Sequence, residues 1–324
     1  MTTGSGPSLP EPVPSRLAAG AFVLVDKPRG PSSHQVTAWA RDLLGVPRAG
    51  HAGTLDPNVS GLLWVGLGPA LRLLPLVLEF PKRYVGVVGF HATVAKSDFL
   101  RVLGEFRGPI FQTPPVRSAV RRERRVRTIY RLELLEFDPP HAVIDLVADS
   151  GTYVRTLAVD LGDALGVGAH LEELRRIGTG PFTEDDAITL AQLADAVAQA
   201  RDGTTAPLEA ILHPAEEVWR EFPRVVLRDA AVAAIAHGAD LARGGIADLP
   251  RPFAQGASVV LVDRKGTLVA LGRALRDSSQ IPAARHGWVV DAQRVFVDPT
   301  HYPRSWKTRG KSPVVEASAS DSSS

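Results

Sequence analysis

An apolar stretch at residues 61–80, GLLWVGLGPALRLLPLVLEF, constrains the fold most, because its side chains must leave water in a membrane or in a protein core. The stretch contains Pro69, Arg72, Pro75 and three glycines, which are poorly suited to an uninterrupted membrane helix. We therefore expect a buried strand followed by a helix, and no association with a membrane.

The chain is long and apolar enough to build more than one core. It has 324 residues, of which 44% are hydrophobic, and a single core usually stops growing near this size. The sequence contains no cysteine, which excludes disulfides, thiolate nucleophiles and cysteine-ligated zinc. The N-terminal residues lack the basic-then-apolar order of a signal peptide, so we expect a cytoplasmic protein.

Positive charge is concentrated in one segment, PPVRSAVRRERRVRTIYR at residues 114–131. Guanidinium groups pair with phosphates and stack on bases, so six arginines and one glutamate between Arg117 and Arg127 predict contact with RNA. A solvated charged hairpin would give the same pattern. The preference for arginine over lysine in the whole chain suits contact with nucleic acid, but a GC-rich genome would also produce it. The expected RNA-binding residues of this segment are Arg117, Arg121, Arg122, Arg124 and Arg125.

The first two thirds of the chain have the apolar periodicity of an α+β unit, with a mixed or antiparallel sheet and flanking helices. Short alternating or continuous apolar runs indicate strands, and apolar residues at helical spacing indicate helices. The expected strands are 22–28, 62–68, 83–90, 130–137 and 142–148, and the expected helices are 32–46, 69–78, 152–166 and 169–178.

The pattern changes near residue 222 to short apolar runs, tight turns such as Arg264-Lys265-Gly266, and one alanine-rich helix. These features predict a small β-rich domain, with HPAEEVWREFP (213–223) as the junction. We expect a disordered lead or an arm of the second domain over 1–17, a catalytic domain over 18–221, the β-rich domain over 222–300 and a largely disordered tail over 301–324.

The segment GHAGTLDP, residues 50–57, contains two ionisable groups, His51 and Asp56. Arg155, which follows Tyr153 in SGTYVRTL at the start of an expected helix, is a candidate partner for the carboxylate. A nearby arginine keeps an acid ionised, and an ionised acid in a sheltered site acts as a nucleophile rather than as an acid catalyst. A purely structural ion pair between Asp56 and Arg155 is the alternative.

Cofactor and metal signatures are missing from the sequence. The nine histidines are scattered without an H-x-x-x-H pair, and no acidic cluster has the spacing of metal ligands. The segments GVGAHL (166–171) and GLGPAL (66–71) lack the third glycine of a dinucleotide-binding loop, and the G-x-x-x-x-G-K-[ST] loop does not occur. We therefore expect no cofactor and no catalytic metal.

Six motifs resemble, in order, those of the TruB-type pseudouridine synthases: LVDKPRGPSSHQV, GHAGTLDP, KRYVG, TPPVRSAV, GTYVRTLAVDLG and GAHLEELRRIGTGPF. The resemblance covers about residues 18–306. The C-terminal part resembles a PUA domain, and its AVAAIAHGADLARGGIADL is similar to the archaeal and eukaryotic dyskerin branch rather than to the bacterial one. The segment GFHATVAKSD (89–98) departs from this branch because it lacks the expected Gly-Asp.

The resemblance assigns roles to the catalytic residues. It implies that Asp56 attacks a uridine that has been flipped out of the RNA, after which the glycosidic bond breaks and the base rejoins through carbon. It implies that Arg155 pairs with Asp56, and that Tyr153 lies against the ring as a proton-transfer residue. Lys27-Pro28 would support the catalytic loop.

Three further residues would surround the base. The resemblance implies that Tyr84 stacks on the flipped base, that Leu174 walls its pocket and that His51 lies near the displaced nucleotide. Without the resemblance, Tyr84 and Tyr153 would be interpreted as core residues, Leu174 as part of a helical core stripe and His51 as bonded to its own loop.

The resemblance also implies a setting for the reaction, the catalytic subunit of a box H/ACA guide-RNA particle acting on rRNA or tRNA. Its implied partners are the guide and substrate RNAs, a small zinc-ribbon-bearing protein, a glycine-arginine-rich-protein homologue and a kink-turn-binding ribosomal-like protein. The PUA-like domain would grip the guide through His237, Gly238 and Asp240 in AHGADLARGGI (236–246). The alternatives are a guide-independent synthase of the tRNA T-arm and a catalytically silent RNA-binding scaffold.

Overall fold

The computed structural model describes residues 15–113, 123–282 and 286–302. The chain forms two compact units, Met1–Ala215 and Glu216–Ser324, which we describe separately. Arg117, Arg121 and Arg122, expected to bind RNA, lie outside the described residues.

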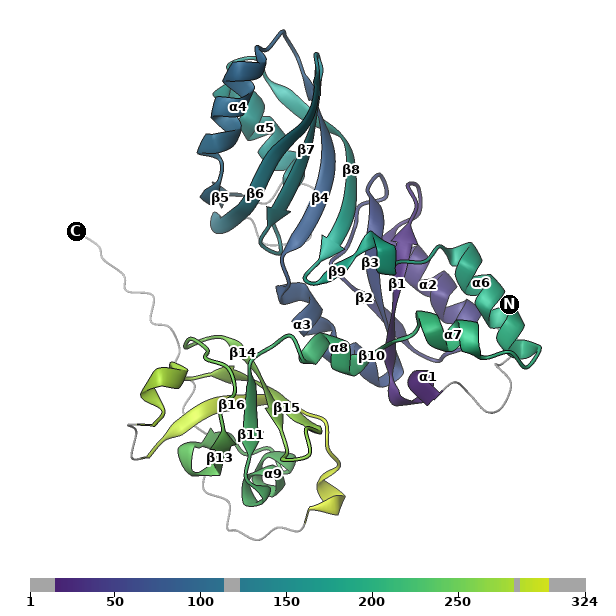
Figure 1. Cartoon of the computed structure of the whole chain (residues 1–324), viewed down its shortest axis with the longest axis vertical. Coiled ribbons are helices and arrows are strands. Elements are labelled where there is room, and N and C mark those ends of the chain that lie inside the picture. Colours follow the sequence, from purple (N-terminus) through teal and green to yellow (C-terminus); the bar gives the residue numbers. More distant parts are fainter. Residues whose placement is uncertain (1–14, 114–122, 283–285, 303–324) are drawn as a thin grey trace. The chain divides into compact units, whose positions relative to one another are not determined.

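The first unit is built on a mixed sheet with strand order β10-β1-β3-β8-β4-β7-β6-β5 (Figure 1). Strand β2 pairs with β3, and β9 pairs with β8. Among the described strand pairs of this sheet, β3 and β8 are parallel and the others are antiparallel. The strands are β1 (Ala21–Lys27), β2 (Ala49–Ala52), β3 (Ser60–Leu67), β4 (Lys82–Phe90), β5 (Gly108–Gln112), β6 (Arg125–Asp138), β7 (His141–Ala148), β8 (Ala169–Thr179), β9 (Phe182–Thr183) and β10 (His213–Pro214).

Two groups of helices bury the apolar side chains of this sheet. Helices α2, α6 and α7 share one core with β1 and β3, and α4 and α5 share another with β4, β6 and β7 (Figure 1). The helices of the first unit are α1 (Ser15–Ala19), α2 (Ser33–Leu44), α3 (Leu74–Glu79), α4 (Lys96–Glu105), α5 (Val154–Ala164), α6 (Leu190–Arg201) and α7 (Ala206–Ile211), with the 3₁₀ turns η1 (Gly68–Leu73) and η2 (Glu184–Asp186); α8 (Ala215–Trp219) spans the boundary of the two units.

Most of the expected elements are confirmed. Helix α2 begins after Ser32, whose side chain accepts from the backbone of Gln35 in a capping box, and it ends at Gly45 in the left-handed conformation. Strands β6 and β7 pair as an antiparallel hairpin. The expected helix at 69–78 is divided into η1 and α3, with Pro69 and Pro75 near their first residues.

Two expectations need correction. The segment 169–178 was expected to be a helix, but it forms strand β8. Leucine, glutamate and arginine favour helix locally, yet the backbone groups of this segment bond to β3 and β4 on either side. Residues 15–17, assigned to a disordered lead or an arm of the second domain, belong to α1, where Leu17 is buried in the core of the first unit.

The second unit is a small β-rich fold, as expected. Its sheet has the order β12-β16-β15-β14-β11-β13, and helix α9 packs its apolar residues against it. The expected turn at residues 264–266 connects β14 to β15, and the amide of Gly266 bonds to the carbonyl of Asp263. The elements are β11 (Arg224–Leu227), α9 (Asp229–Ala236), β12 (Leu241–Ala242), η3 (Arg243–Gly245), β13 (Ile246–Asp248), β14 (Ser258–Val262), β15 (Leu268–Ala274), η4 (Ser278–Gln280), β16 (Trp288–Val295) and η5 (Pro299–His301).

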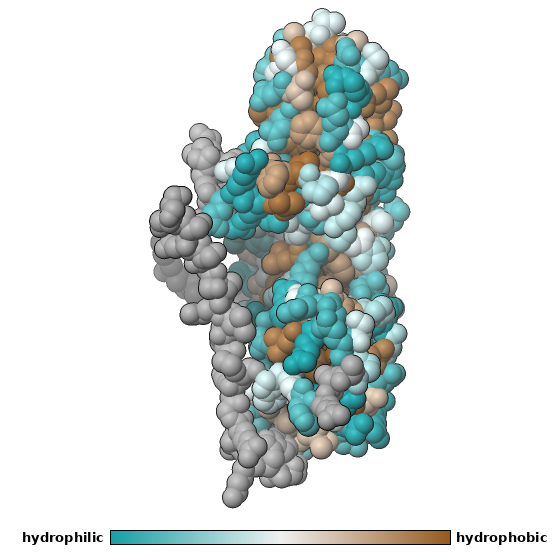
Figure 2. Space-filling model, turned by 90° about the vertical axis from the view of Figure 1, so that its left-hand side faces the viewer, coloured by the Kyte–Doolittle hydropathy of each residue, from teal (hydrophilic) through white to brown (hydrophobic). Residues whose placement is uncertain are grey.

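The apolar stretch at 61–80 is used inside the protein. Leu62, Leu63, Trp64 and Val65 of β3 are fully buried. In the described parts of the chain, no helix is long and apolar enough to cross a membrane. On the face that Figure 2 shows, hydrophobic residues lie in separate areas between hydrophilic ones.

Candidate active site

The loop that carries Asp56 connects β2 to β3 and is fixed by contacts with the start of α2. The buried hydroxyl of Ser33 accepts from the amide of Leu55 and donates to its carbonyl, both at 2.8 Å. The amide of Gly30 donates to the carbonyl of Pro57 at 2.8 Å. Asp56 is therefore held between two anchored residues, so the position of its carboxylate is defined by the fold.

The side chain of Lys27 bonds to the same loop. Its side chain is buried, and its ammonium donates to the carbonyls of Pro28 and Pro31 at 2.8 and 2.9 Å and to that of Pro57 at 3.4 Å. Burial lowers the pKa of Lys27, and the negative charge of Asp56 opposes that shift. The lysine thus connects the end of β1 to the catalytic loop and lies within electrostatic range of the carboxylate.

Asp56 and Arg155 form an ion pair, although 99 residues separate them in the sequence. Arg155 lies in the first turn of α5, and its Nη2 atom donates to Oδ2 of Asp56. The Asp56 side chain is 58% exposed and that of Arg155 is 54% exposed, so the carboxylate is open to solvent rather than sheltered.

Tyr153 immediately precedes α5 and occupies its N-cap position. Gln112, at the end of β5, holds the backbone of Tyr153 from both sides. Its Oε1 accepts from the Tyr153 amide at 2.9 Å, and its Nε2 donates to the Tyr153 carbonyl at 3.1 Å. Gln112 is only 3% exposed. We did not predict this residue, because nothing in the local sequence marks a glutamine that bonds to a backbone 41 residues away.

Tyr84 and Leu174 lie on the adjacent strands β4 and β8. Tyr84 pairs in register with Arg176, and Gly86 pairs with Leu174. Because residues two apart on a strand share a face, Tyr84 and Leu174 lie on the same face of the sheet. Both pack at the margin of the core formed with α4 and α5. Leu174 is thus a strand residue, and its interpretation as part of a helical core stripe was wrong.

His51, on β2, is bonded on both sides of its ring. Its Nδ1 atom lies 3.1 Å from the hydroxyl of Thr37, and its Nε2 atom lies 3.3 Å from that of Thr54 in the catalytic loop. Burial, and then electrostatic repulsion from His34 and Arg176, lower the pKa of His51. The imidazole is therefore neutral at pH 7, and it bonds to its own loop, as the alternative interpretation expected.

Lys82 is a second buried lysine near the site that we did not predict. Its ammonium donates to the carbonyls of Val77, Leu78 and Phe80, at the C-terminal end of α3, at 2.6–3.0 Å. It also contacts the hydroxyl of Ser150, just before α5, at 3.3 Å. Burial, helped by the positive charge of Arg176, lowers the pKa of Lys82 to about 7.

The described end of the arginine segment combines cations with an exposed aromatic ring. The guanidinium of Arg124 lies 4.2 Å from the centre of the Phe111 ring, and Phe111 is 62% exposed. Arg125 lies 3.9 Å from Glu123, a weak exposed contact. An arginine stacked on an exposed aromatic ring can bind the phosphates and bases of a nucleic acid. The same pair is also compatible with a surface that contacts only water.

In the second unit, the residues expected to bind the guide follow α9. His237 Nε2 lies 2.8 Å from the carbonyl of Tyr302, and Asp240 accepts from the amide of Ala292 at 3.1 Å. Gly238 has a φ of 84°, which a residue with a side chain rarely adopts. His237 and Asp240 therefore have structural partners, and Gly238 makes the turn between them.

Among the described residues, no group of three or more histidine, aspartate or glutamate side chains could hold a metal ion.

Three protein-family models match the chain. TruB family pseudouridylate synthase (N terminal domain) matches residues 41–154, and tRNA pseudouridylate synthase B C-terminal domain matches residues 155–219. The PUA domain matches residues 223–296.

Similar proteins cover nearly the whole chain. A protein named "Probable tRNA pseudouridine synthase B" from Methanothermobacter thermautotrophicus is 48% identical, over 88% of this chain and 88% of its own length. A protein with the same name from Pyrobaculum calidifontis is 44% identical, over 96% of this chain and 95% of its own.

Solved structures are also similar to this chain over nearly its whole length. A chain in "Crystal Structure of a Cbf5-Nop10-Gar1 Complex" is 39% identical with a TM-score of 0.83, covering 94% of this chain and 93% of its own. A chain in "Structure of H/ACA RNP bound to a substrate RNA containing 2'-deoxyuridine" is 37% identical with a TM-score of 0.78, covering 94% of both chains. With the ion pair of Asp56 and Arg155 in place, these matches show that the chain belongs to the TruB family and is an RNA pseudouridine synthase with a C-terminal PUA domain.

Proposed function

We propose that this protein is the catalytic subunit of a guide-RNA-directed box H/ACA particle that converts uridine to pseudouridine in rRNA or tRNA. The observation that carries the proposal is the likeness over 94% of the chain, both units included, to a protein crystallised as a Cbf5-Nop10-Gar1 complex. A second likeness over the same share is to a protein in an H/ACA particle bound to a substrate RNA.

Asp56 supplies the nucleophile in this proposal. Its carboxylate is exposed and paired with Arg155, so it is within reach of a uridine that enters the site. The reaction breaks the bond from the sugar to N1 of the base and forms one to C5; the proton lost from C5 is balanced by one gained at N1. Because no group or electron pair leaves the substrate, the chemistry needs no external donor.

The residues around the carboxylate position the base. Tyr84 stacks on the flipped uridine, and Leu174 on the next strand forms an apolar wall. Tyr153 lies beside the ring for proton transfer, two residues before Arg155, and Gln112 fixes its backbone. His51, neutral and bonded to Thr54, borders the loop near the displaced nucleotide.

RNA binding involves both units. Arg124, stacked on Phe111, and the other arginines of segment 117–125 bind phosphates and bases of the RNA near the site. The PUA domain grips the ACA trinucleotide and lower stem of the guide with the segment around Gly238. We further propose counterparts of Nop10 and Gar1 and a kink-turn-binding ribosomal-like protein as partners, and a cytoplasmic location.

A guide-independent synthase of the tRNA T-arm is the second candidate. It is favoured by the name "Probable tRNA pseudouridine synthase B", which the relatives at 48% and 44% identity share. In that mode the same Asp56 chemistry acts on a stem-loop that the enzyme recognises without a guide.

The test compares two RNAs on the full chain at one salt concentration. A guide hairpin with an intact ACA is expected to bind more tightly than one in which that trinucleotide is scrambled, and pseudouridine is expected to form in a guide-complementary target only when the guide is present. Asp56→Asn should bind the same hairpins and produce no pseudouridine. Equal affinity for both hairpins, with efficient modification of a bare tRNA T-arm, would establish the second candidate instead.

A further inference from the structure

Arg176 is a fully buried arginine beneath the catalytic loop. Its side chain lies on strand β8, two residues beyond Leu174, and the residue is 2% exposed. Among the described residues, no carboxylate forms an ion pair with it, and its Nη2 atom has no hydrogen-bond partner. A buried charge without a carboxylate partner destabilises a fold, so a contribution to stability does not explain why an arginine occupies this position.

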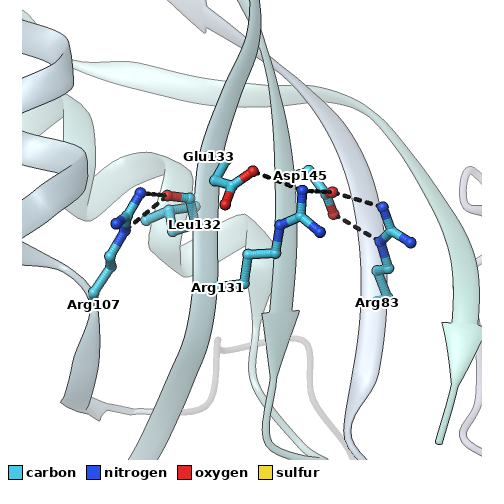
Figure 3. A network of polar contacts seen from close by, with 6 residues as sticks. All are labelled: Arg83, Arg107, Arg131, Leu132, Glu133 and Asp145. Carbon is cyan, nitrogen blue, oxygen red and sulfur yellow. Dashed lines mark hydrogen bonds and ion pairs between the residues drawn. The ribbon is translucent and has the colours of Figure 1, made fainter.

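Other arginines of this sheet have acidic partners. Arg83 and Arg131 both pair with the buried carboxylate of Asp145, at 2.8 and 3.2 Å, and Arg131 also reaches Glu133 (Figure 3). Ile144 and Leu146 pack with α4 and α5, so Asp145 between them lies on the opposite face of the sheet. Arg176 differs from these arginines both in its burial and in its partners.

The contacts of Arg176 join three parts of the site. Its Nε atom donates to the carbonyl of Leu62 on β3 at 2.7 Å. Its Nη1 atom would lie 3.0 Å from a Cβ atom added to Gly53, which has a φ of 68° and begins the turn toward Asp56. On β4, Tyr84 lies directly opposite Arg176 in register and on the same face of the sheet, and the two side chains interact electrostatically. One side chain thus lies beside strand β3, the catalytic loop and the proposed base-stacking tyrosine.

The geometry defines what each contact can do. A guanidinium has only donors and the Tyr84 oxygen can accept, so a donor of Arg176, whose Nη2 is unpaired, can orient the phenol ring on the opposite strand. The space left by Gly53 lets the loop lie directly on the planar guanidinium. The positive charge also lowers the pKa values of His51 and Lys82, a second sign that it lies under the site and is poorly screened.

We propose that Arg176 is a positioning residue for pseudouridine formation, whose guanidinium fixes the ring of Tyr84 relative to the loop that carries Asp56. The inference rests on the proposed role of Tyr84 as the residue that stacks on the flipped uridine. A base that stacks on a misplaced ring is misplaced relative to the nucleophile, and small displacements are costly in a reaction that depends on orientation.

The first measurement needs no substrate. The chain contains four tyrosines, Tyr84, Tyr130, Tyr153 and Tyr302, so protein labelled with ¹³C at the tyrosine ζ carbon gives few signals. Loss of one signal in Tyr84→Phe assigns Tyr84. In Arg176→Met, which keeps the length of the side chain but removes the donors, that signal should shift. The signal of Tyr130, whose hydroxyl bonds to Asp149 at 2.6 Å, should stay in place as the internal reference.

The second measurement is kinetic. Because a hydrogen bond to a charged group is lost, Arg176→Met should lower kcat by about tenfold to a hundredfold, while KM for the RNA stays within a few-fold. In a Tyr84→Phe background the same change should cost less than about threefold, because the acceptor of the bond is already gone. Arg176→Lys keeps a charge but not the fork of donors, and should recover only part of kcat.

Arg107, an exposed arginine, provides a control for the loss of a guanidinium that bonds to a backbone carbonyl. Its guanidinium also caps a backbone carbonyl, that of Leu132, at 2.8 and 3.0 Å, but it touches no residue of the site (Figure 3). Arg107→Met should lower thermal stability without moving the Tyr84 signal or changing kcat per folded molecule.

Three results would overturn the inference. The first is an unmoved Tyr84 signal in Arg176→Met. The second is a fold-loss of kcat in the double variant that equals the product of the fold-losses in Tyr84→Phe and Arg176→Met. The third is a loss in Arg176→Met that follows only the fraction of unfolded protein, as in the Arg107 control. If the wild-type chain formed no pseudouridine, the proposed function would fail, but the NMR signal would still decide whether Arg176 positions Tyr84.

Discussion

Lys82 offers a test of the structure through the pH dependence of stability. The residue is 3% exposed, and its pKa is lowered from 10.5 to about 7, first by burial and then by the charge of Arg176. An unfolded chain returns this lysine to water and to its ordinary pKa. Folded and unfolded protein therefore bind different numbers of protons at the same pH, and stability must change with pH.

The sign and size of the change follow from linkage. Above pH 7 the unfolded chain binds up to one more proton than the folded chain, so the free energy of unfolding rises with pH. The slope approaches about 1.4 kcal/mol per pH unit, and integration gives a rise of about 2 kcal/mol between pH 7 and pH 9. Below pH 7 the lysine is protonated in both states, and its contribution to stability is at its lowest.

The assay is urea unfolding of the full chain from pH 6 to pH 9, followed by circular dichroism. Lys82→Met should be less stable than wild type at every pH, because three carbonyls lose their donor, and it should also lack the rise between pH 7 and pH 9. The difference between the two curves isolates this one group from all others that titrate. Lys96→Met, an exposed lysine on α4, should keep the wild-type slope.

Equal slopes in wild type and Lys82→Met would refute this reasoning. Such a result would mean that the carbonyls of Val77, Leu78 and Phe80, at the negative end of α3, hold the ammonium charged in the folded state and cancel the cost of burial.

Three further outcomes can be measured on the full chain. Asp56→Asn should abolish pseudouridine formation while RNA affinity stays within a few-fold, because an amide keeps the shape but is a far poorer nucleophile; wild-type turnover would exclude Asp56. Arg155→Ala should remove most activity with little change in thermal stability, whereas a large loss of stability with normal turnover per folded molecule would indicate a structural ion pair. Replacing Arg124 and Arg125 by alanine should weaken RNA binding and flatten its dependence on salt, and an unchanged salt slope would leave the pair as a solvated face.

Local signals predicted much of the catalytic unit. Helix α2 was recognisable because Ser32 and Gln35 form a capping box at the right spacing before an apolar stripe. The helix expected at 152–166 begins at Val154 without a side-chain cap, and the pairing of Arg155 with Asp56 agreed with the match of opposite charges and with the resemblance. Such features depend on residues close in sequence or on simple complementarity.

The segment at 169–178 shows where local signals fail. Leu171, Leu174 and the charged residues between them favour a helix by propensity and by spacing. As a strand, the same segment satisfies its backbone groups by bonding to β4 along its length, which local propensity does not anticipate. Tertiary hydrogen bonding therefore overrode a weak helical preference.

The supporting residues of the site were not predictable. Gln112, Lys82 and Arg176 all bond to backbone groups of segments that are distant or that carry no distinctive side chain. A backbone carbonyl has no sequence signature. A buried side chain that donates to a carbonyl therefore cannot be told from any other polar residue in the sequence. Only the three-dimensional arrangement distinguishes Arg176 from the exposed arginines of the same chain.

The location of the site follows from the topology of the sheet. Asp56 comes from the half of the sheet that contains β1, β2 and β3, whereas Tyr84, Arg155 and Leu174 come from the half that contains β4 to β8. The two halves meet at the parallel pair β3–β8, where Gly61 lies opposite Arg176. A Cβ atom on Gly61 would lie 2.1 Å from the carbonyl oxygen of Arg176, so only glycine allows this approach. This topology brings Asp56 and Arg155, 99 positions apart in the sequence, together, and a residue that bonds across the junction, as Arg176 does to Leu62, is in the right place to keep the two halves of the active site aligned.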